Sequence, residues 1–258
     1  MTTYLDNILE QHRAAAASDR RPVDALVTDA AAMPPTRGFA EALRGQSALA
    51  VIGEIKRRSP SKGDLFADLD PATIAQAYQR GGASCLSVLT DSPHFGGSVA
   101  DLQTAVAACN LPVLRKDFTV DERDVVDTRL MGADCVLLIA AALDRAQLRA
   151  FHDLATSIGL DVLVEIHDEE ELEVALDADA LIIGVNQRDL VTFRVDHERA
   201  VRMAELIPSN IVKVAESGVR GRDDALSLRR AGYDAVLVGE SLVTSTDPAL
   251  AIADLCVV

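Results

Sequence analysis

The chain has 258 residues, of which 49% are hydrophobic, and it carries a formal net charge of −15. This length and composition allow one α/β barrel or two small domains with ample cores. The negative charge argues against binding to nucleic acid, which requires a basic surface, and no apolar run is long enough to span a bilayer.

Residues 1–48 precede the first strand-like run and have a helical rhythm without the apolar core of a signal peptide. Four apolar residues fall on one helical stripe, namely Tyr4, Leu5, Ile8 and Leu9, and a second helical stretch lies around residues 38–45. We therefore expect an N-terminal helical extension over 1–48 that covers one mouth of the fold. With it, residues 1–258 are expected to form a single domain.

Eight apolar, β-branched runs follow turn residues and predict strands. They lie at residues 49–55, 84–90, 111–118, 134–140, 161–166, 180–186, 210–218 and 234–241. Between them are amphipathic stretches with apolar positions at helical spacing, for example at 71–80, 98–109, 145–159 and 222–232. Strict alternation of strand and helix predicts a parallel sheet.

A weak repeat, with copies about fifty residues apart, precedes every second strand. Each copy consists of a helix-ending turn, a small residue and an apolar strand. Gly82, Gly132 and Gly232 would cap their helices in the left-handed conformation, and Asp177 takes this place in the third copy. Four such quarters predict an α/β fold of the closed (β/α)8 type, a TIM barrel. An open doubly wound sheet is the alternative, although no GxGxxG turn supports it.

The carboxyl ends of the predicted strands carry polar residues on the inward face, where the active site of such a barrel lies. They are Glu54 and Lys56, Lys116, Glu165, Asn186 and Arg188, Glu216, and finally Gly239. A single charge at a strand end usually just emerges into solvent. Four strands with ionisable residues at equivalent heights instead predict a ring of acid-base groups, whose pKa values are shifted by burial and mutual pairing.

Lysine is rare in this chain, which has Lys56, Lys62, Lys116 and Lys213 only, so nearly all positive charge is arginine. The excess of carboxylates fits adaptation to high salt, which we favour, or the codon bias of a GC-rich genome. In either case a retained lysine is informative. Arginine replaces lysine on a solvated surface, but it does not release a proton near neutral pH.

Glycine and serine follow the seventh and eighth strands, at Ser217, Gly218 and Gly239. Backbone N–H groups after these strands commonly bind phosphate in barrels of this type, although structural turns also use such residues. Phe95 and Phe118 follow two other strand ends in a chain that is only 3% aromatic. An aromatic ring of a substrate could pack there, and ordinary loop packing is an equal alternative.

The cysteines predict free thiols in a reducing compartment, for which we expect the cytoplasm. They lie far apart with no CxxC spacing, at Cys85, Cys109, Cys135 and Cys256. Four of the histidines show no spacing typical of metal ligands: His12, His94, His152 and His167. No metal site is therefore expected.

Eight motifs resemble the indole-3-glycerol-phosphate synthase family in order and spacing: EIKRRSPSKG, LTDSPHFGGS, LRKDF, LLI, LVEIHDEEEL, IGVNQRDL, VAESGV and VGESL. The resemblance runs from Val51 to the C-terminus and covers the N-terminal helices more loosely. It implies an enzyme of tryptophan biosynthesis, a carboxy-lyase that acts on 1-(2-carboxyphenylamino)-1-deoxyribulose 5-phosphate. The products would be indole-3-glycerol phosphate, carbon dioxide and water, formed without a cofactor or a metal.

The resemblance also implies roles for individual residues. Lys116 would be the general acid that protonates the ketone, and Glu165 would act as general acid or base, with Lys56 assisting. Which of Lys56 and Glu165 handles the final dehydration stays open. The other implied site residues orient or bind the substrate: Glu54 and Asn186 orient it, Ser59 and Lys62 reach it from the SPSKG loop, Arg188, Ser217, Gly218 and Gly239 hold its phosphate, Phe95 and Phe118 flank its ring, and Glu216 lies among them.

Two other functions remain open. A sugar-phosphate isomerase similar to phosphoribosylanthranilate isomerase would use a Cys-Asp or Asp-Asp pair as its acid and base. A non-catalytic barrel that binds a phosphorylated metabolite would not need Lys116 and Glu165 together. In each case we expect a small anionic ligand, no nucleic-acid or membrane partner, and a monomer.

Overall fold

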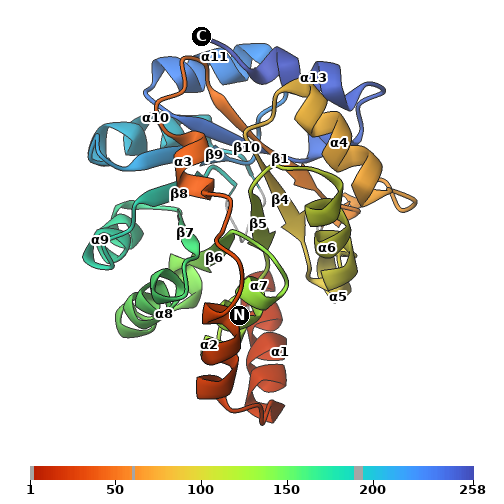
Figure 1. The fold of residues 1–258 in the computed structure, drawn as a ribbon. Helices are drawn as coiled ribbons and strands as arrows, with labels where there is room; N and C mark the ends of the chain where they lie inside the picture. Colours follow the sequence, from red (N-terminus) through yellow and green to blue (C-terminus); the bar gives the residue numbers. More distant parts are fainter. Residues whose placement is uncertain (1–2, 60–61, 189–193) are drawn as a thin grey trace.

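The computed structural model describes residues 3–59, 62–188 and 194–258. Within these residues, eight parallel strands close into a barrel in the order β1-β10-β9-β8-β7-β6-β5-β4 (Figure 1). They are β1 (Ala50–Ile55), β4 (Cys85–Leu89), β5 (Val113–Lys116), β6 (Cys135–Ile139), β7 (Asp161–Ile166), β8 (Ile182–Asn186), β9 (Val212–Glu216) and β10 (Ala235–Val238). Because β1 pairs with both β4 and β10, the (β/α)8 barrel is confirmed and the open sheet is excluded.

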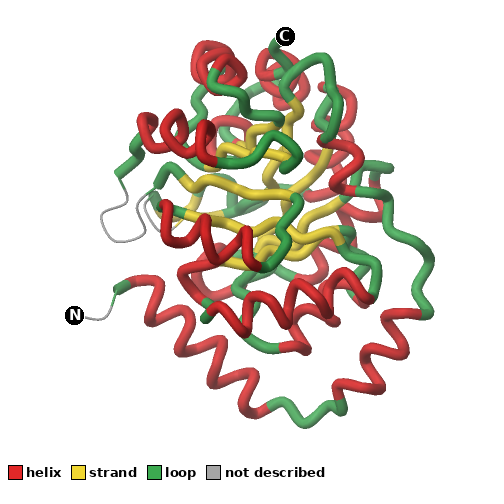
Figure 2. The backbone as a smooth tube through the Cα atoms, turned by 90° about the vertical axis from the view of Figure 1, so that its left-hand side faces the viewer, coloured by secondary structure: helices red, strands yellow, loops and turns green. Residues whose placement is uncertain are grey.

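Helices follow the strands in the chain and cover the outside of the barrel. In Figure 2 these helices surround the strands. The longer ones are α4 (Pro71–Gly81), α6 (Val99–Ala108), α7 (Glu122–Leu130), α8 (Arg145–Ser157), α9 (Glu169–Asp177), α10 (His197–Leu206), α11 (Arg222–Arg230) and α13 (Pro248–Leu255). Shorter elements are the hairpin β2 (Arg58–Ser59) and β3 (Gly63–Asp64), the helices α5 (Ser92–Phe95) and α12 (Glu240–Val243), and the 3-10 turn at Ala140–Ala142.

Aspartate begins most of the longer helices. Six of them have an aspartate N-cap whose side chain accepts a backbone N–H of the first turn: Asp70, Asp121, Asp144, Asp168, Asp196 and Asp247. A carboxylate there satisfies an otherwise unpaired donor and faces the positive end of the helix dipole. Part of the acidic excess of this chain therefore has a local structural role.

In three of the four copies of the repeat, the glycine that the sequence predicted follows the end of the helix. Gly82, Gly132 and Gly232 have φ between 91° and 95°, the left-handed conformation expected of a capping glycine. The assignment of Asp177 was wrong, because Asp177 is the last residue of α9 and the positive φ of 58° belongs to Asp179. An aspartate is tolerated there because its short side chain reduces the steric penalty.

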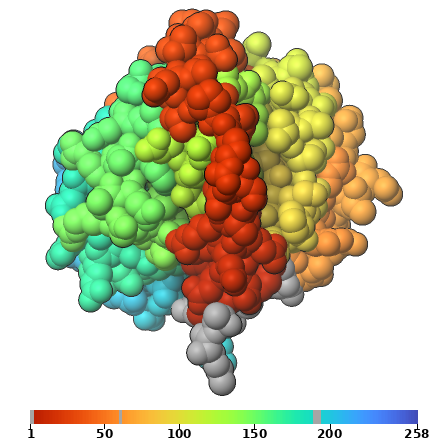
Figure 3. Space-filling view, turned by 90° about the horizontal axis from the view of Figure 1, so that it is seen from below, coloured from red at the N-terminus to blue at the C-terminus, as the bar shows by residue number. Residues whose placement is uncertain are grey.

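Three helices precede the barrel: α1 (Tyr4–Ser18), α2 (Val23–Ala31) and α3 (Phe39–Leu43). The sequence predicted the first and third, and α2 was missed. Near α3 the backbone N–H of Ala40 donates to Asp161, at the start of β7. At the other end of the barrel, Arg13 of α1 donates to the carbonyl of Ala142, just beyond β6. In Figure 3 this segment crosses one face of the molecule as a continuous band.

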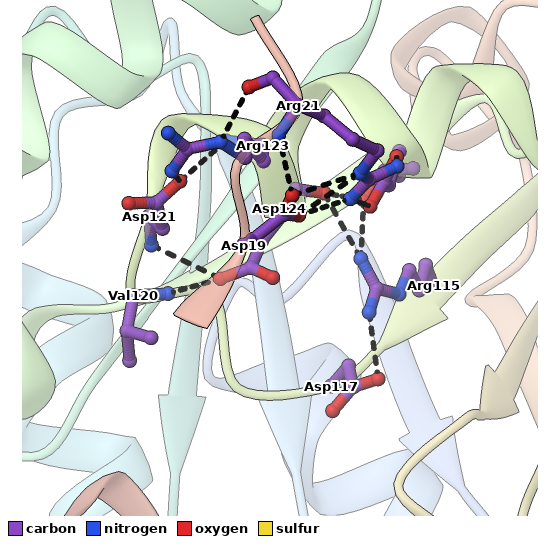
Figure 4. Close-up of polar contacts among 10 residues, drawn as sticks. Asp19, Arg21, Arg115, Asp117, Val120, Asp121, Arg123 and Asp124 are labelled. Atoms are coloured by element: carbon purple, nitrogen blue, oxygen red, sulfur yellow. Dashed lines mark hydrogen bonds and ion pairs between the residues drawn. The ribbon is translucent and has the colours of Figure 1, made fainter. Parts of the chain in front are cut away.

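The turn between α1 and α2 is bound to α7 (Figure 4). Arg21 pairs with Asp19 within the turn and with Asp127 of α7 at 2.7 Å. Arg123 of α7 donates in return to the carbonyl of Arg21 and pairs with Asp121. These contacts fix the position of α1 relative to the strand ends.

Among the described helices, none combines the length and apolar character needed to cross a membrane.

Candidate active site

A cavity of about 700 Å³ opens at the carboxyl ends of the strands. All of the site residues expected from the sequence lie on its wall: Glu54, Lys56, Ser59, Lys62, Phe95, Lys116, Phe118, Glu165, Asn186, Arg188, Glu216, Ser217, Gly218 and Gly239. Residues far apart in the chain meet here because barrel closure brings the strand ends to one level. Pro60 and Ser61 of the SPSKG loop lie outside the described residues.

Lys116 stands at the centre of the polar ring. Its Nζ donates to Glu165 Oε2 at 2.8 Å and lies 3.7 Å from Glu216 Oε2. Both carboxylate side chains are almost completely buried, with 2% of their surface exposed. Gly184 of β8 makes room for Glu216, because a Cβ at this position would overlap its carboxylate. One ammonium therefore faces two buried carboxyl groups.

Burial and mutual repulsion separate the pKa values of the two carboxyl groups. Burial, together with the charges of Glu165 and Glu54, raises the pKa of Glu216 to about 8 against the pull of Lys116. Burial also acts on Glu165, but Lys116 and His167 outweigh it and lower the pKa of Glu165 to about 2. Burial alone would lower the pKa of Lys116; Glu165, Glu216 and Glu54 together raise it above its usual value. At pH 7 the ring thus holds a charged Lys116, an ionised Glu165 and a neutral Glu216.

Asn186 fixes the second oxygen of Glu165. Its side-chain amide donates to Glu165 Oε1 at 3.0 Å, and its own oxygen accepts the backbone N–H of Arg188 at 3.0 Å. Glu165 is therefore held between Lys116 and Asn186, one on each carboxylate oxygen. This arrangement orients the carboxylate and keeps it ionised.

Glu54 and Lys56 form an ion pair of their own at the end of β1. Their carboxylate and ammonium lie against Gly239, where a Cβ would overlap Glu54 and contact Lys56 Nζ at 3.1 Å. The two charges in this strand are buried because they face the cavity and pair with each other. Gly239 is therefore required for the close approach of these side chains.

The far side of the cavity is lined by backbone in unusual conformations. Ser217 and Gly218 have φ of 65° and 76°, and the Gln187 side chain donates to the Ser217 carbonyl at 2.8 Å. Close to them in the barrel order, Lys62 after β1 pairs with Glu240 after β10. The hydroxyl of Ser59 is buried and has no hydrogen-bond partner within the described residues. This side can therefore offer a hydroxyl, an ammonium and backbone donors to an anion.

Aromatic side chains close the opposite side of the cavity. The rings of Phe95 and Phe118 lie 6.2 Å apart, and His12 of α1 lies 5.4 Å from Phe118. Helix α1 also supplies Tyr4, Leu5 and Ile8 to the wall. The sequence had predicted that the extension covers one mouth, but it did not identify these residues as part of the site.

Three possible metal ligands, His12, Asp91 and Asp117, meet where α1 crosses the strand ends. His12 Nε2 lies 3.1 Å from Asp91 and 3.9 Å from Asp117. The oxygens of Asp117 already accept from Arg115 at 2.9 Å and from the backbone N–H of Phe118 at 2.9 Å. We interpret the group as a hydrogen-bonded anchor for α1. The linear spacing of the histidines could not have revealed it.

Other polar wall residues were missed, among them His197 and Ser241. His197 begins α10 and its Nδ1 lies 3.0 Å from Gln187 Oε1. Ser241 follows Gly239, so the VGESL motif contained the signal for it. Within the described residues, no strand leads directly into His197. The alternation of side chains along a strand therefore could not predict which way His197 points. Residues 189–193 before it lie outside the described chain.

Comparison with known proteins finds one family over nearly the whole chain. The family model "Indole-3-glycerol phosphate synthase" matches residues 5–255. Indole-3-glycerol phosphate synthase of Streptomyces griseus is 51% identical over 98% of this chain and 94% of its own length. The Mycolicibacterium smegmatis protein of the same name is 49% identical over 98% and 93%.

Solved structures with little sequence similarity share the fold alone. Thiamine phosphate pyrophosphorylase of Pyrococcus furiosus has a TM-score of 0.61 at 18% identity, covering 80% of this chain and 93% of its own. N-acetylmannosamine-6-phosphate 2-epimerase of Clostridium perfringens has a TM-score of 0.59 at 14% identity, with coverage of 74% and 86%.

Proposed function

This chain belongs to the indole-3-glycerol phosphate synthase family, and from that premise we propose how its own side chains perform the reaction. The enzyme closes the indole ring of 1-(2-carboxyphenylamino)-1-deoxyribulose 5-phosphate and releases carbon dioxide and water. The observation that carries the assignment of roles is the buried Lys116–Glu165 pair at the barrel mouth. An isomerase of related fold or a plain metabolite-binding barrel would not require it.

The two ends of the cavity suit the two ends of the substrate. The phosphate would bind beside Ser217, Gly218 and Gly239, on a part of the wall that also contains the cations Arg188 and Lys62. The anthranilate ring would lie between Phe95 and Phe118, against the apolar residues of α1. This orientation places the ketone between the ends, over the polar ring. Holding both ends fixes the reacting carbon atoms and lowers the entropic part of the barrier.

Lys116 acts as the general acid in the ring closure. The ring carbon attacks the ketone, and the electron pair of the carbonyl moves onto its oxygen, which becomes an alkoxide. An alkoxide is a stronger base than an amine, so a charged Lys116 can transfer its proton even with a raised pKa. The raised pKa ensures that Lys116 carries this proton at the start of each cycle.

Glu165 acts as the base in the dehydration, and Lys56 as the acid. Loss of the carboxylate as carbon dioxide returns its bonding electrons to the ring. The hydroxyl then leaves as water with a proton from Lys56, while the ionised Glu165 removes a C–H proton from the carbon next to nitrogen. Glu54 orients Lys56 through their ion pair, Asn186 orients Glu165, and neutral Glu216 donates a hydrogen bond to a substrate hydroxyl.

A turnover assay tests this proposed function. Purified protein is mixed with the anilino-deoxyribulose phosphate, and indole fluorescence and released carbon dioxide are measured together. Both should appear at the same rate. Isomerisation without carbon dioxide, or binding without turnover, would contradict the proposed function.

Two further features of the protein are proposed here. We infer a cytoplasmic location, because the four cysteines are free thiols, of which Cys85 and Cys135 are buried. We also propose a monomer, because one chain closes the barrel and its N-terminal helix completes the wall of the cavity, so the site requires no partner. Light scattering at working concentration tests the second proposal.

A further inference from the structure

Next to Glu165 lies a histidine that the mechanism above does not use. His167 Nδ1 lies 3.0 Å from Glu171 Oε2, and its Nε2 lies 3.7 Å from Glu165 Oε1. His167 does not line the cavity. Its Nε2 is buried and has no hydrogen-bond partner within the described residues. We propose that His167 and Glu171 relay protons between Glu165 and solvent, a role that rests on the proposed function.

The local backbone holds the histidine in this position. Glu165 and His167 are two residues apart at the end of β7, so both side chains leave the same side of the strand. Glu171, in the first turn of α9, accepts the backbone N–H of His167 at 2.7 Å, and the same oxygen lies 3.0 Å from the ring Nδ1. Asp168 caps the same turn through the backbone N–H of Glu171. The ring is thus fixed at Nδ1, and Nε2 faces the catalytic carboxylate.

Exposure rises along the three groups. The exposed fraction of the side chain is 2% for Glu165, 11% for His167 and 19% for Glu171. Glu171 therefore reaches water, whereas Glu165 does not. The groups connect a buried carboxylate to solvent by a path that substrate in the cavity would not block.

The reaction requires a supply of protons from solvent. The substrate enters with an ionised carboxylate and loses it as neutral carbon dioxide. One proton goes onto the ketone oxygen, a second leaves with the hydroxyl as water, and one returns from the C–H bond. Each turnover thus takes one net proton from solvent. Glu165 contacts Lys116, so a proton delivered to Glu165 after ring closure can recharge Lys116 while the substrate still fills the cavity. The C–H proton that Glu165 later removes leaves by the same path, and Lys56 regains its proton from solvent once the product has left.

The proton path is balanced at each atom. Glu171 passes a proton taken from water to Nδ1, and Nε2–H passes its proton to Glu165 Oε1, which leaves the other tautomer of the ring. A half-turn of the ring then resets it. The 3.7 Å separation exceeds a hydrogen bond, so the last transfer needs an approach of about 1 Å when substrate binds.

Charged groups around the ring favour exchange near neutral pH. Glu165 on β7 and Glu171 on α9 face the ring, and Arg199 on α10 opposes them. Burial lowers the pKa of His167, but the two carboxylates outweigh it and raise this pKa above its ordinary value of 6.5. The imidazole can therefore both accept and release a proton in the range where the enzyme works.

The test compares the rate of a single turnover with the steady-state rate over many turnovers. His167→Gln should lower steady-state kcat about tenfold or more, while single turnovers with excess enzyme stay near the wild-type rate, because the first proton is already loaded. Small buffers such as imidazole should restore kcat in proportion to their concentration. Glu171→Gln keeps the hydrogen bond to the ring but carries no proton, and should show the same pattern.

His152→Gln is the matched control. His152 is another buried histidine with an unpartnered nitrogen within the described residues, but it lies on α8 outside the cavity, and its loss should change neither rate. Equal slowing of single and multiple turnovers by His167→Gln would show that His167 only holds Glu165 in place. An unchanged kcat and pH profile would exclude the relay. If the wild type formed no indole product, the proposed function would fail instead, and the two failures are therefore distinguishable.

Discussion

Replacing Lys116 with arginine tests whether this residue donates a proton or only supplies charge. The ammonium lies 2.8 Å from Glu165 and 3.7 Å from Glu216, and the adjoining cavity gives room for a longer side chain. A guanidinium would keep the ion pair, so the fold should remain intact. It releases no proton near neutral pH, so kcat should fall by about 10²–10⁴, equivalent to about 2.7–5.4 kcal/mol of activation free energy.

Two further variants separate charge from chemistry. Lys116→Met removes the charge as well, leaves buried Glu165 unpaired, and should lower the free energy of unfolding by about 3–5 kcal/mol. Lys213→Arg is the control, because Lys213 points away from the barrel interior and its Nζ donates to the Ala204 carbonyl at 2.6 Å. Its kcat should be unchanged. Indole fluorescence at saturating substrate gives kcat, and thermal unfolding gives stability. If Lys116→Arg turns over near the wild-type rate, Lys116 is only an electrostatic anchor and the mechanism is wrong.

Three other outcomes are expected. With a net charge of −15, thermal stability and activity should rise from low to molar salt because screening relieves self-repulsion; a flat or falling unfolding midpoint would favour codon bias instead. Arg188→Ala should raise KM for substrate, and Ki for inorganic phosphate, more than it lowers kcat; an effect on kcat alone would move Arg188 into the chemistry. Because the native pKa of Glu216 is raised to about 8, its contribution to the free energy of unfolding is fully present below pH 4.5 and is lost as pH rises toward 8. Glu216→Gln should flatten this dependence in thermal unfolding between pH 5 and 8, and a profile as steep as that of the wild type would mean that Glu216 is ionised in the native protein.

The sequence predicted the barrel because its evidence is local. A strand that alternates faces and a helix of 3.6-residue period are encoded by neighbouring residues, so β1 and the seven other barrel strands could be placed from pattern alone. The same alternation put Glu54, Lys116 and Glu165 on the inward face at similar heights. Where the local signal was ambiguous, the prediction failed, as it did for Asp177 in place of Asp179, and for α2.

Only the tertiary structure decided how these residues pair and which of them are charged. Lys116 and Glu216 are 100 residues apart in sequence, and their separation of 3.7 Å depends on the register of the closed barrel. The neutral state of Glu216 follows from burial beside Glu165, which no spacing along the chain reveals. Likewise, α1 forms a wall of the cavity because contacts with α7 and Asp91 hold it there. The identity of each side chain is written locally, but its pKa depends on neighbours that only the folded chain supplies.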